Sequence, residues 1–236
     1  MSYTSYSEAR MSLHSKASHS KPRKSMRAPV REIAFRPESI AAAKTTLVLR
    51  PHGNAASNAA YLITTEDHIP VYTVSGRKSG DRVCREFYDP SGLPLFELHT
   101  KTMLGRPLSW FITMPGGGSD MKIAEGQPRW AGTQKSMVFS FRNMAAVDNK
   151  REEEKNMSLL VTSTGQVMAR YDIIDGDRRI AGVNESIHHN ETLALMPQSR
   201  RKSLRPAMDL TVVPGVDTLL IAAIAVIMFE WTYGAE

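Results

Sequence analysis

Residues 216–233 read VDTLLIAAIAVIMFEWTY, and this stretch decides the fold. Its pattern predicts a helix with apolar side chains on every side, which must be buried in a protein core or in a membrane. The uncharged part, residues 218–229, covers roughly 18 Å at ~1.5 Å per residue, against ~30 Å for the hydrocarbon core of a bilayer. Asp217 and Glu230 bound this part. We therefore expect a core helix, with a membrane anchor as the alternative.

The chain before this helix predicts a β-rich domain. Short runs of β-branched and aromatic residues, separated by turn-forming residues, recur from residue 45 onward. These runs cover residues 45–50, 60–64, 71–75, 82–88, 93–99, 108–114, 137–142, 158–162, 166–172, 179–183, 191–195 and 210–213. Asp89-Pro90-Ser91-Gly92 fits a type I turn, and Asp175-Gly176 fits a tight hairpin turn. About ten to twelve short strands at regular spacing are typical of a sandwich or a barrel.

A closed barrel that encloses the apolar helix accounts for both features. A closed sheet has no free edges, and larger barrels have room inside for more than their own side chains. We expect Leu220, Ile224 and Ile227 to face the surrounding core. Asp217 is expected to cap the helix, because a carboxylate accepts the unpaired N–H groups of the first turn. Trp231 is expected either to plug the barrel mouth or to lie in a membrane interface.

The positive charge of the chain is concentrated at its N-terminal end. The net charge is +6, and the first 31 residues hold seven of the 30 basic residues and one of the 24 acidic residues. The remainder is therefore neutral, with 23 residues of each sign. Residues 1–40 are rich in Ser and poor in large apolar residues, so we expect a disordered tail followed by one domain over residues 41–236.

Two clusters of basic residues are candidate contacts for an anionic partner, although solvated charge without a binding role is the alternative. They are Lys21, Arg23, Lys24, Arg27 and Arg31 in the tail, and Arg200, Arg201, Lys202 and Arg205 in the last long loop. An anionic membrane surface attracts basic residues by ~1 kcal/mol each, and nucleic acid would attract the same side chains. Ser25 and Ser203 follow basic runs and are candidate phosphorylation sites, where added negative charge would weaken either contact.

Catalytic and metal-binding motifs are not found in the sequence. It contains no Gly-x-Ser-x-Gly elbow, no His-Glu-x-x-His helix and no P-loop. The single cysteine, Cys84, excludes a disulfide framework, and we expect it to be a small buried side chain. The N-terminus has no apolar signal-peptide region. We expect a monomeric, intracellular protein that is not an enzyme and has neither a metal nor a cofactor, located in the cytoplasm, peripherally at membranes or in the nucleus.

Several motifs resemble those of one known family. Residues 208–231 (MDLTVVPGVDTLLIAAIAVIMFEW) are similar to the end of the LURP-one-related proteins, which finish with a strand, a Pro-Gly-Val-Asp corner and a buried helix. Residues 87–96 (FYDPSGLPLF) resemble the first signature of that family, and residues 106–112 and 165–172 resemble later strands. The similarity spans about residues 45–233. The basic tail and the loops near residues 115–135 and 184–206 depart from the pattern, so nothing is carried over to them.

The resemblance implies a twelve-stranded barrel around the C-terminal helix, similar to the tubby C-terminal domain and the phospholipid scramblases. Tubby-type domains bind phosphoinositides and act as membrane-tethered regulators. The resemblance therefore implies a regulator that binds an anionic phospholipid or a protein partner. The alternatives are a scramblase-like membrane protein anchored by its last helix and a DNA-linked regulator. We do not expect nucleic acid to be the partner, because the tail has few interleaved aromatic residues and no DNA-binding motif is present.

Overall fold

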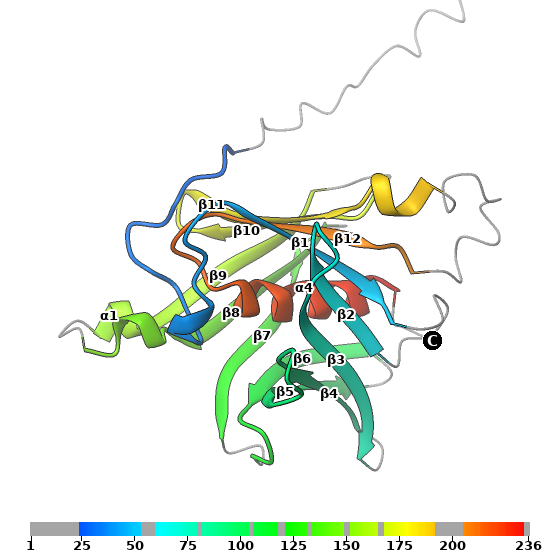
Figure 1. The fold of residues 1–236 in the computed structure, drawn as a ribbon. Coiled ribbons are helices and arrows are strands. Elements are labelled where there is room, and N and C mark those ends of the chain that lie inside the picture. The colour runs from blue at the N-terminus through cyan, green and yellow to red at the C-terminus, as the bar shows by residue number, and fades with distance from the viewer. Residues whose placement is uncertain are drawn as a thin grey trace, which may run out of the picture.

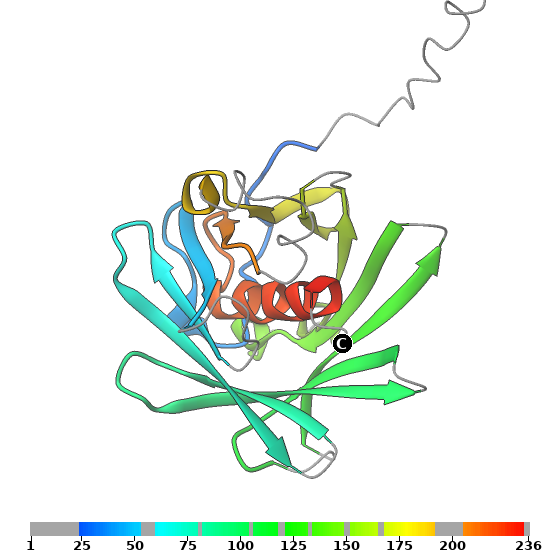
Figure 2. The same cartoon turned by 90° about the vertical axis from the view of Figure 1, so that its right-hand side faces the viewer.

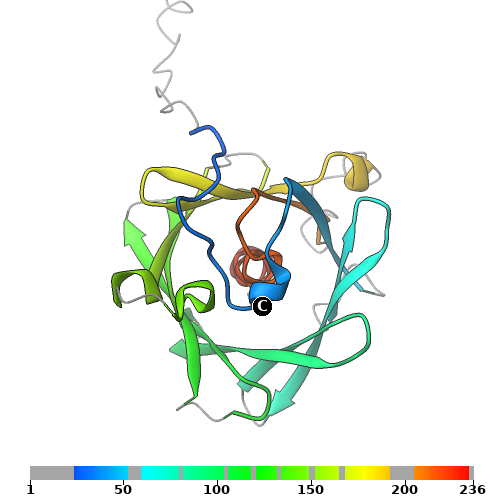
Figure 3. The same ribbon diagram turned by 60° about the vertical axis from the view of Figure 1, so that its left-hand side comes forward.

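A closed barrel of twelve antiparallel strands forms the body of the protein, and β12 pairs with β1 to close it (Figure 3). The computed structural model describes residues 24–52, 60–79, 82–103, 106–117, 121–131, 134–148, 152–164, 168–191 and 205–233. The strands are β1 (Thr45–Pro51), β2 (Ala60–Thr65), β3 (Pro70–Ser79), β4 (Arg82–Tyr88), β5 (Pro94–Met103), β6 (Arg106–Thr113), β7 (Lys122–Ala131), β8 (Gln134–Arg142), β9 (Asn156–Ser163), β10 (Arg170–Asp175), β11 (Arg178–Glu185) and β12 (Met208–Val212). The expected barrel is confirmed.

Strand β7 is the main departure from the sequence-based expectation. No strand-like run is recognised in the sequence near residues 115–135, and this stretch is expected to be a loop. In the structure, Gly126 pairs with Phe139 of β8, and a Cβ atom at this position would lie 2.7 Å from the sulfur of Met137. The glycine therefore makes room for a neighbouring core side chain. The strand expected over residues 191–195 falls almost wholly outside the described residues, and Glu191 ends a short helix, η3 (His188–Asn190).

Helix α4 (Thr218–Tyr233) runs through the middle of the barrel (Figures 1 and 2). Leu220, Ile224 and Ile227 are fully buried, as expected, and so is every other residue from Leu219 to Phe229. Trp231 is also buried and packs against Trp110 of β6, with ring centroids 5.3 Å apart. Among the described residues, no helix has the length and apolar character needed to cross a membrane. The strands of the barrel surround this buried helix.

Asp217 joins the start of α4 to the N-terminal segment. Its Oδ1 accepts hydrogen bonds from the backbone N–H groups of Leu219 and Leu220, at 2.7 and 3.3 Å, which confirms the expected cap. Its Oδ2 accepts two more, from Phe35 at 2.9 Å and Arg36 at 3.0 Å. Burial raises the pKa of Asp217 to about 6, although the backbone donors favour its ionised form. One carboxylate therefore serves two segments that are far apart in the sequence.

The expectation of disorder over residues 1–40 is wrong for the part that the structure describes. Residues 24–41 lie along the barrel and cross the end at which α4 begins (Figure 3). Ile33, Ala34 and Phe35 are buried, and the Phe35 ring lies 5.2 Å from that of Phe141. Asn143 holds this segment by accepting a hydrogen bond from the Ala34 N–H at 2.9 Å. The physical reason is that these apolar residues cover the core where the strands leave it open.

Two glycines shape the turns that the sequence predicts. Gly92, at the end of the turn between β4 and β5, has a φ of +86°, and its N–H donates to the Asp89 carbonyl at 3.0 Å. Gly215 has a φ of +82° in the corner between β12 and α4. L-residues with side chains rarely adopt this conformation, so glycine is required where the chain reverses into the helix.

We expect Ile224→Ala to destabilise the fold by ~2–5 kcal/mol, because it leaves a cavity at the centre of a packed core. Ile187→Ala is the matched control, since that side chain is 76% exposed and its loss should change the stability by less than ~0.5 kcal/mol. Denaturant unfolding measures both. Equal losses of stability in Ile224→Ala and Ile187→Ala would contradict the central position of α4. A chain truncated after residue 215 that stays soluble and melts cooperatively would also contradict it.

The stability of the fold should depend on pH through Asp217. The folded state holds this proton more tightly than the unfolded state, with a pKa of about 6 against 3.8. The stabilising contribution of protonated Asp217 to the free energy of unfolding is therefore fully present below pH ~4. It is lost as the pH rises through about 6, and the free energy of unfolding falls by ~3 kcal/mol. Unfolding of the wild type and of Asp217→Asn between pH ~4 and ~7 should show the wild-type advantage shrinking with pH. A constant difference would mean that Asp217 stays ionised.

Candidate functional site

The basic residues expected to bind anionic lipid are only partly described. Lys24, Arg27, Arg31 and Arg205 belong to the described residues. The others, Lys21, Arg23, Arg200, Arg201 and Lys202, lie outside them, as does Ser203. The described members do not form one group, because Lys24 and Arg27 belong to a segment bonded to Arg179 of β11, whereas Arg205 is bonded to Tyr233 at the end of α4.

Residues 24–31, called here the basic segment, are joined to the start of β11, where Met26 forms an isolated bridge with Arg179. The Arg27 N–H donates to the Arg179 carbonyl at 3.0 Å, and the Arg178 guanidinium donates to the Ala28 carbonyl at 2.9 Å. Lys24 and Arg27 point into solvent. The large apolar side chain of Val30, in the same segment, is 80% exposed. The candidate phosphorylation site, Ser25, is exposed and accepts a hydrogen bond from Arg27 Nε at 3.3 Å.

Arg205 belongs instead to a polar network at the C-terminal end of α4. Its guanidinium donates to the Tyr61 hydroxyl at 3.0 Å and to the Tyr233 carbonyl at 3.2 Å. A cation beside the last helical carbonyls is stabilising, so this arginine has a structural contact rather than a free surface position. The expectation that it contacts lipid together with its loop neighbours is therefore not supported by its position.

The same network contains a buried ion pair. Arg85 projects inward from β4 and pairs with Glu230 of α4, which also accepts a hydrogen bond from the Tyr61 hydroxyl at 3.4 Å. Burial raises the pKa of Glu230, and the guanidinium of Arg85 opposes that shift. Lys135 donates to the Trp231 carbonyl at 2.9 Å. The network thus satisfies the polar groups with which α4 ends.

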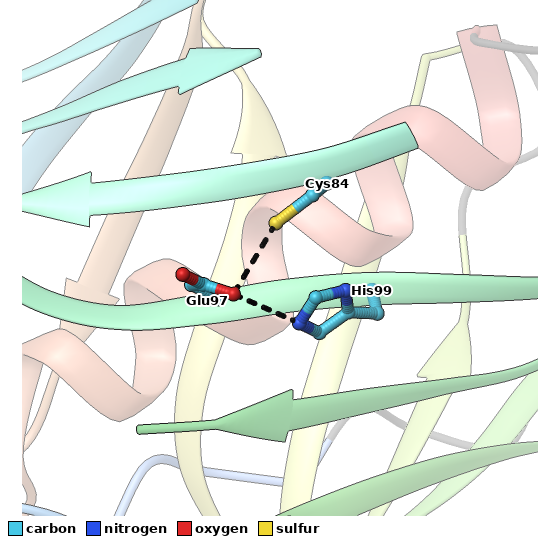
Figure 4. A group of neighbouring side chains, drawn as sticks. All are labelled: Cys84, Glu97 and His99. Atoms are coloured by element: carbon cyan, nitrogen blue, oxygen red, sulfur yellow. Dashed lines mark hydrogen bonds and ion pairs between the residues drawn. The ribbon is translucent and has the colours of Figure 1, made fainter. Parts of the chain in front are cut away.

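A second cluster, called here the outer cluster, lies on the outside of the barrel and consists of Cys84, Glu97 and His99. Cys84 comes from β4 and the other two from β5, where His99 is the direct partner of Cys84. In Figure 4 the three side chains lie on the near side of their strands, with α4 behind. Cys84 Sγ lies 3.9 Å from Glu97 Oε2, and His99 Nε2 lies 3.3 Å from the same oxygen.

Neighbouring strands hold these side chains in place. The Gly116 N–H, in the loop after β6, donates to Glu97 Oε1 at 2.9 Å. The His99 ring stacks on Phe111 of β6, with centroids 4.9 Å apart and an interplanar angle of 14°. Its Nε2 also lies 3.1 Å from the hydroxyl oxygen of the fully buried Thr113. A thiol, a carboxylate and an imidazole therefore converge in a largely buried position.

Sequence reasoning missed the outer cluster. A metal site was not expected because the chain has only one cysteine, and residues 84, 97 and 99 match no ligand motif. One feature of the sequence could have indicated this cluster. Leu98 points into the core, so its neighbours Glu97 and His99 must both point to the opposite face of the strand. Pairing of that strand with the one carrying Cys84 then brings the three side chains to one face.

Replacing Arg85 should be more damaging than removing the whole ion pair. Arg85→Leu leaves the Glu230 carboxylate buried without its main counter-charge, which we expect to cost ~3–5 kcal/mol of unfolding free energy. The double variant Arg85→Leu/Glu230→Leu should recover a large part of this loss, because no buried charge is left. Denaturant unfolding of the two variants tests this. A double variant as unstable as the single one would show that the charges are not the cause.

Comparison with known proteins agrees with this architecture. The model of the LURP-one-related family matches residues 45–229, from the first residue of β1 almost to the end of α4. A solved structure of a protein from Arabidopsis thaliana has a TM-score of 0.50 and 15% identity, over 84% of this chain and 96% of that chain, so the likeness concerns the fold. No curated protein matches. Because the family match covers most of the barrel and its helix, the chain belongs to the LURP-one-related family.

Proposed function

We propose that this protein is a non-enzymatic regulator that attaches to anionic phospholipid surfaces through the basic segment. The observation that carries the proposal is the exposed pair Lys24 and Arg27 beside the exposed Val30, on a segment fixed to β11. An apolar side chain among cations suits the boundary between headgroups and acyl chains. The side chains of α4 fill the middle of the barrel, which favours a binding surface on the outside.

Electrostatic attraction supplies one part of the proposed attachment. Each basic residue near an anionic leaflet contributes ~1 kcal/mol, and Lys24 and Arg27 are both exposed in this segment. The sequence before the basic segment adds Arg10, Lys16, Lys21 and Arg23. Attachment of this kind weakens at high salt, because mobile ions screen exposed charges beyond a distance of ~10 Å. It also implies a cytoplasmic location with a peripheral position at the membrane.

The position of α4 weighs against the scramblase-like alternative, because the helix that would enter the lipid is the core of the barrel. Nucleic acid offers phosphate groups to the same cations, so it belongs in the test as a competitor. Nothing in the proposal requires a chemical reaction.

Co-sedimentation of the full chain with vesicles tests the proposal. We expect binding to vesicles that contain phosphatidylinositol bisphosphate, weaker binding at high salt, and no binding to neutral phosphatidylcholine. Lys24→Ala/Arg27→Ala should weaken the apparent affinity by about 30-fold, from two contributions of ~1 kcal/mol each. The matched control, Lys101→Ala/Arg129→Ala, removes two exposed cations from other strands and should bind as the wild type does.

Two further variants separate charge from apolar contact. Val30→Ser should weaken binding at high salt as well as at low salt, because loss of an apolar contact is not screened. Ser25→Glu should weaken binding mainly at low salt, as phosphorylation at this position would. Equal binding by the Lys24→Ala/Arg27→Ala variant and its control would overturn the proposal, and so would a preference for DNA over the phosphoinositide vesicles in direct competition.

A further inference from the structure

We propose that the outer cluster is a binding site for a divalent metal ion of the zinc class, with Cys84, Glu97 and His99 as its protein ligands. The proposal does not rest on lipid binding. In the closed strand order, β5 is six steps from β11, so the outer cluster and the basic segment lie on opposite sides of the barrel. Failure of one proposal therefore leaves the other standing.

The spacing of the ligand atoms is close to what a tetrahedral ion requires. Zinc bonds of ~2.3 Å to sulfur and ~2.0–2.2 Å to nitrogen or oxygen place neighbouring ligand atoms about 3.4–3.6 Å apart at tetrahedral angles. In the structure, the Glu97 oxygen lies 3.3 Å from His99 Nε2 and 3.9 Å from Cys84 Sγ. All three ligand atoms lie within 4.8 Å of one another. Small side-chain rotations would thus complete the coordination.

The charges of the donors match a divalent ion. A cysteine thiolate and a carboxylate together carry two negative charges, and a neutral imidazole adds none. Cys84 is 1% exposed and Glu97 7%, so a neutral assembly avoids the high cost of an unpaired buried charge. One sulfur, one nitrogen and one oxygen donor favour zinc over magnesium and calcium, which prefer oxygen ligands alone.

The surroundings provide outer contacts of the kind that metal sites use. The Gly116 N–H binds the Glu97 oxygen that faces away from the other ligands, which leaves Oε2 to face the ion. Phe111 fixes the plane of the His99 ring by stacking. Such partners orient ligands and strengthen metal binding. Because the ligands sit on paired strands, their relative positions are set by the sheet. Three protein ligands leave a fourth position for water or another small ligand.

Cobalt is the probe that tests this site, because Co²⁺ replaces zinc in tetrahedral sites and its absorption reports on its ligands. The chain has a single cysteine, so any thiolate-to-cobalt band must come from Cys84. We expect one equivalent of Co²⁺ to bind to the chelator-treated full chain, with a thiolate band and visible bands of tetrahedral intensity. Zn²⁺ should displace it. Binding should tighten with rising pH, because the thiol loses its proton.

Variants of each ligand provide the second part of the test. Cys84→Ser should abolish the thiolate band, and Glu97→Gln and His99→Gln should each weaken Zn²⁺ binding by more than the 10–100-fold that outer partners typically contribute. Glu125→Gln and His52→Gln are the matched controls, since both residues lie outside the cluster and should leave the affinity unchanged. Circular dichroism of each metal-free variant establishes that it is folded.

Two outcomes would overturn the proposal. The first is folded wild-type protein that binds no Co²⁺, or binds it without a thiolate band, a result that needs no variant. The second is Zn²⁺ binding that persists with the same affinity in Cys84→Ser and in His99→Gln. Such binding would place the ion elsewhere, and the neighbouring rings of His68, His188 and His189 would then be the alternative to examine.

Discussion

The burial of a helix that is apolar on all sides is the constraint on which the rest of the structure depends. Helix α4 cannot be left in water on any face, so the sheet must surround it, and twelve strands provide the necessary width. Each end of the helix then needs polar partners inside the barrel. Asp217 supplies them at the start, and Arg205, Lys135 and the Arg85–Glu230 pair supply them at the end.

The parts of this fold that could be predicted from the sequence are those set by local patterns. The apolar pattern of the helix, the aspartate that caps it and the turn residues that separate most strands can each be recognised within a few positions of the sequence. Two parts were missed because distant contacts override the local signal. The stretch near residues 115–135 was expected to be a loop, yet Gly126 lies in strand β7, where Met137 packs over it. Phe35 lies in a charged stretch, and its backbone N–H donates to Asp217, which lies 182 residues further along the chain.

The outer cluster could not be predicted because it depends on strand register. A regular hairpin after the turn at residues 89–93 would continue the pairing of Tyr88 with Pro94 and would set Cys84 opposite Leu98. A bulge between Phe87 and Tyr88 shifts the register by one residue, so Cys84 faces His99 instead. A shift of one residue exchanges the two faces of a strand pair. The bulge thus places the thiol beside polar side chains on the outside of the barrel.

The division between inside and outside also limits where function can reside. Among the described residues, the buried charges that face α4 are engaged with it: Arg85 pairs with Glu230, and Asp217 accepts hydrogen bonds from the first turn of the helix. A ligand that used them would have to displace the helix and expose its apolar surface, at ~25 cal/mol per Å². Contacts on the outside carry no such cost. The outer cluster and the exposed side chains of the basic segment lie on opposite sides of the barrel, so a ligand bound at either one would leave the core and the other one undisturbed.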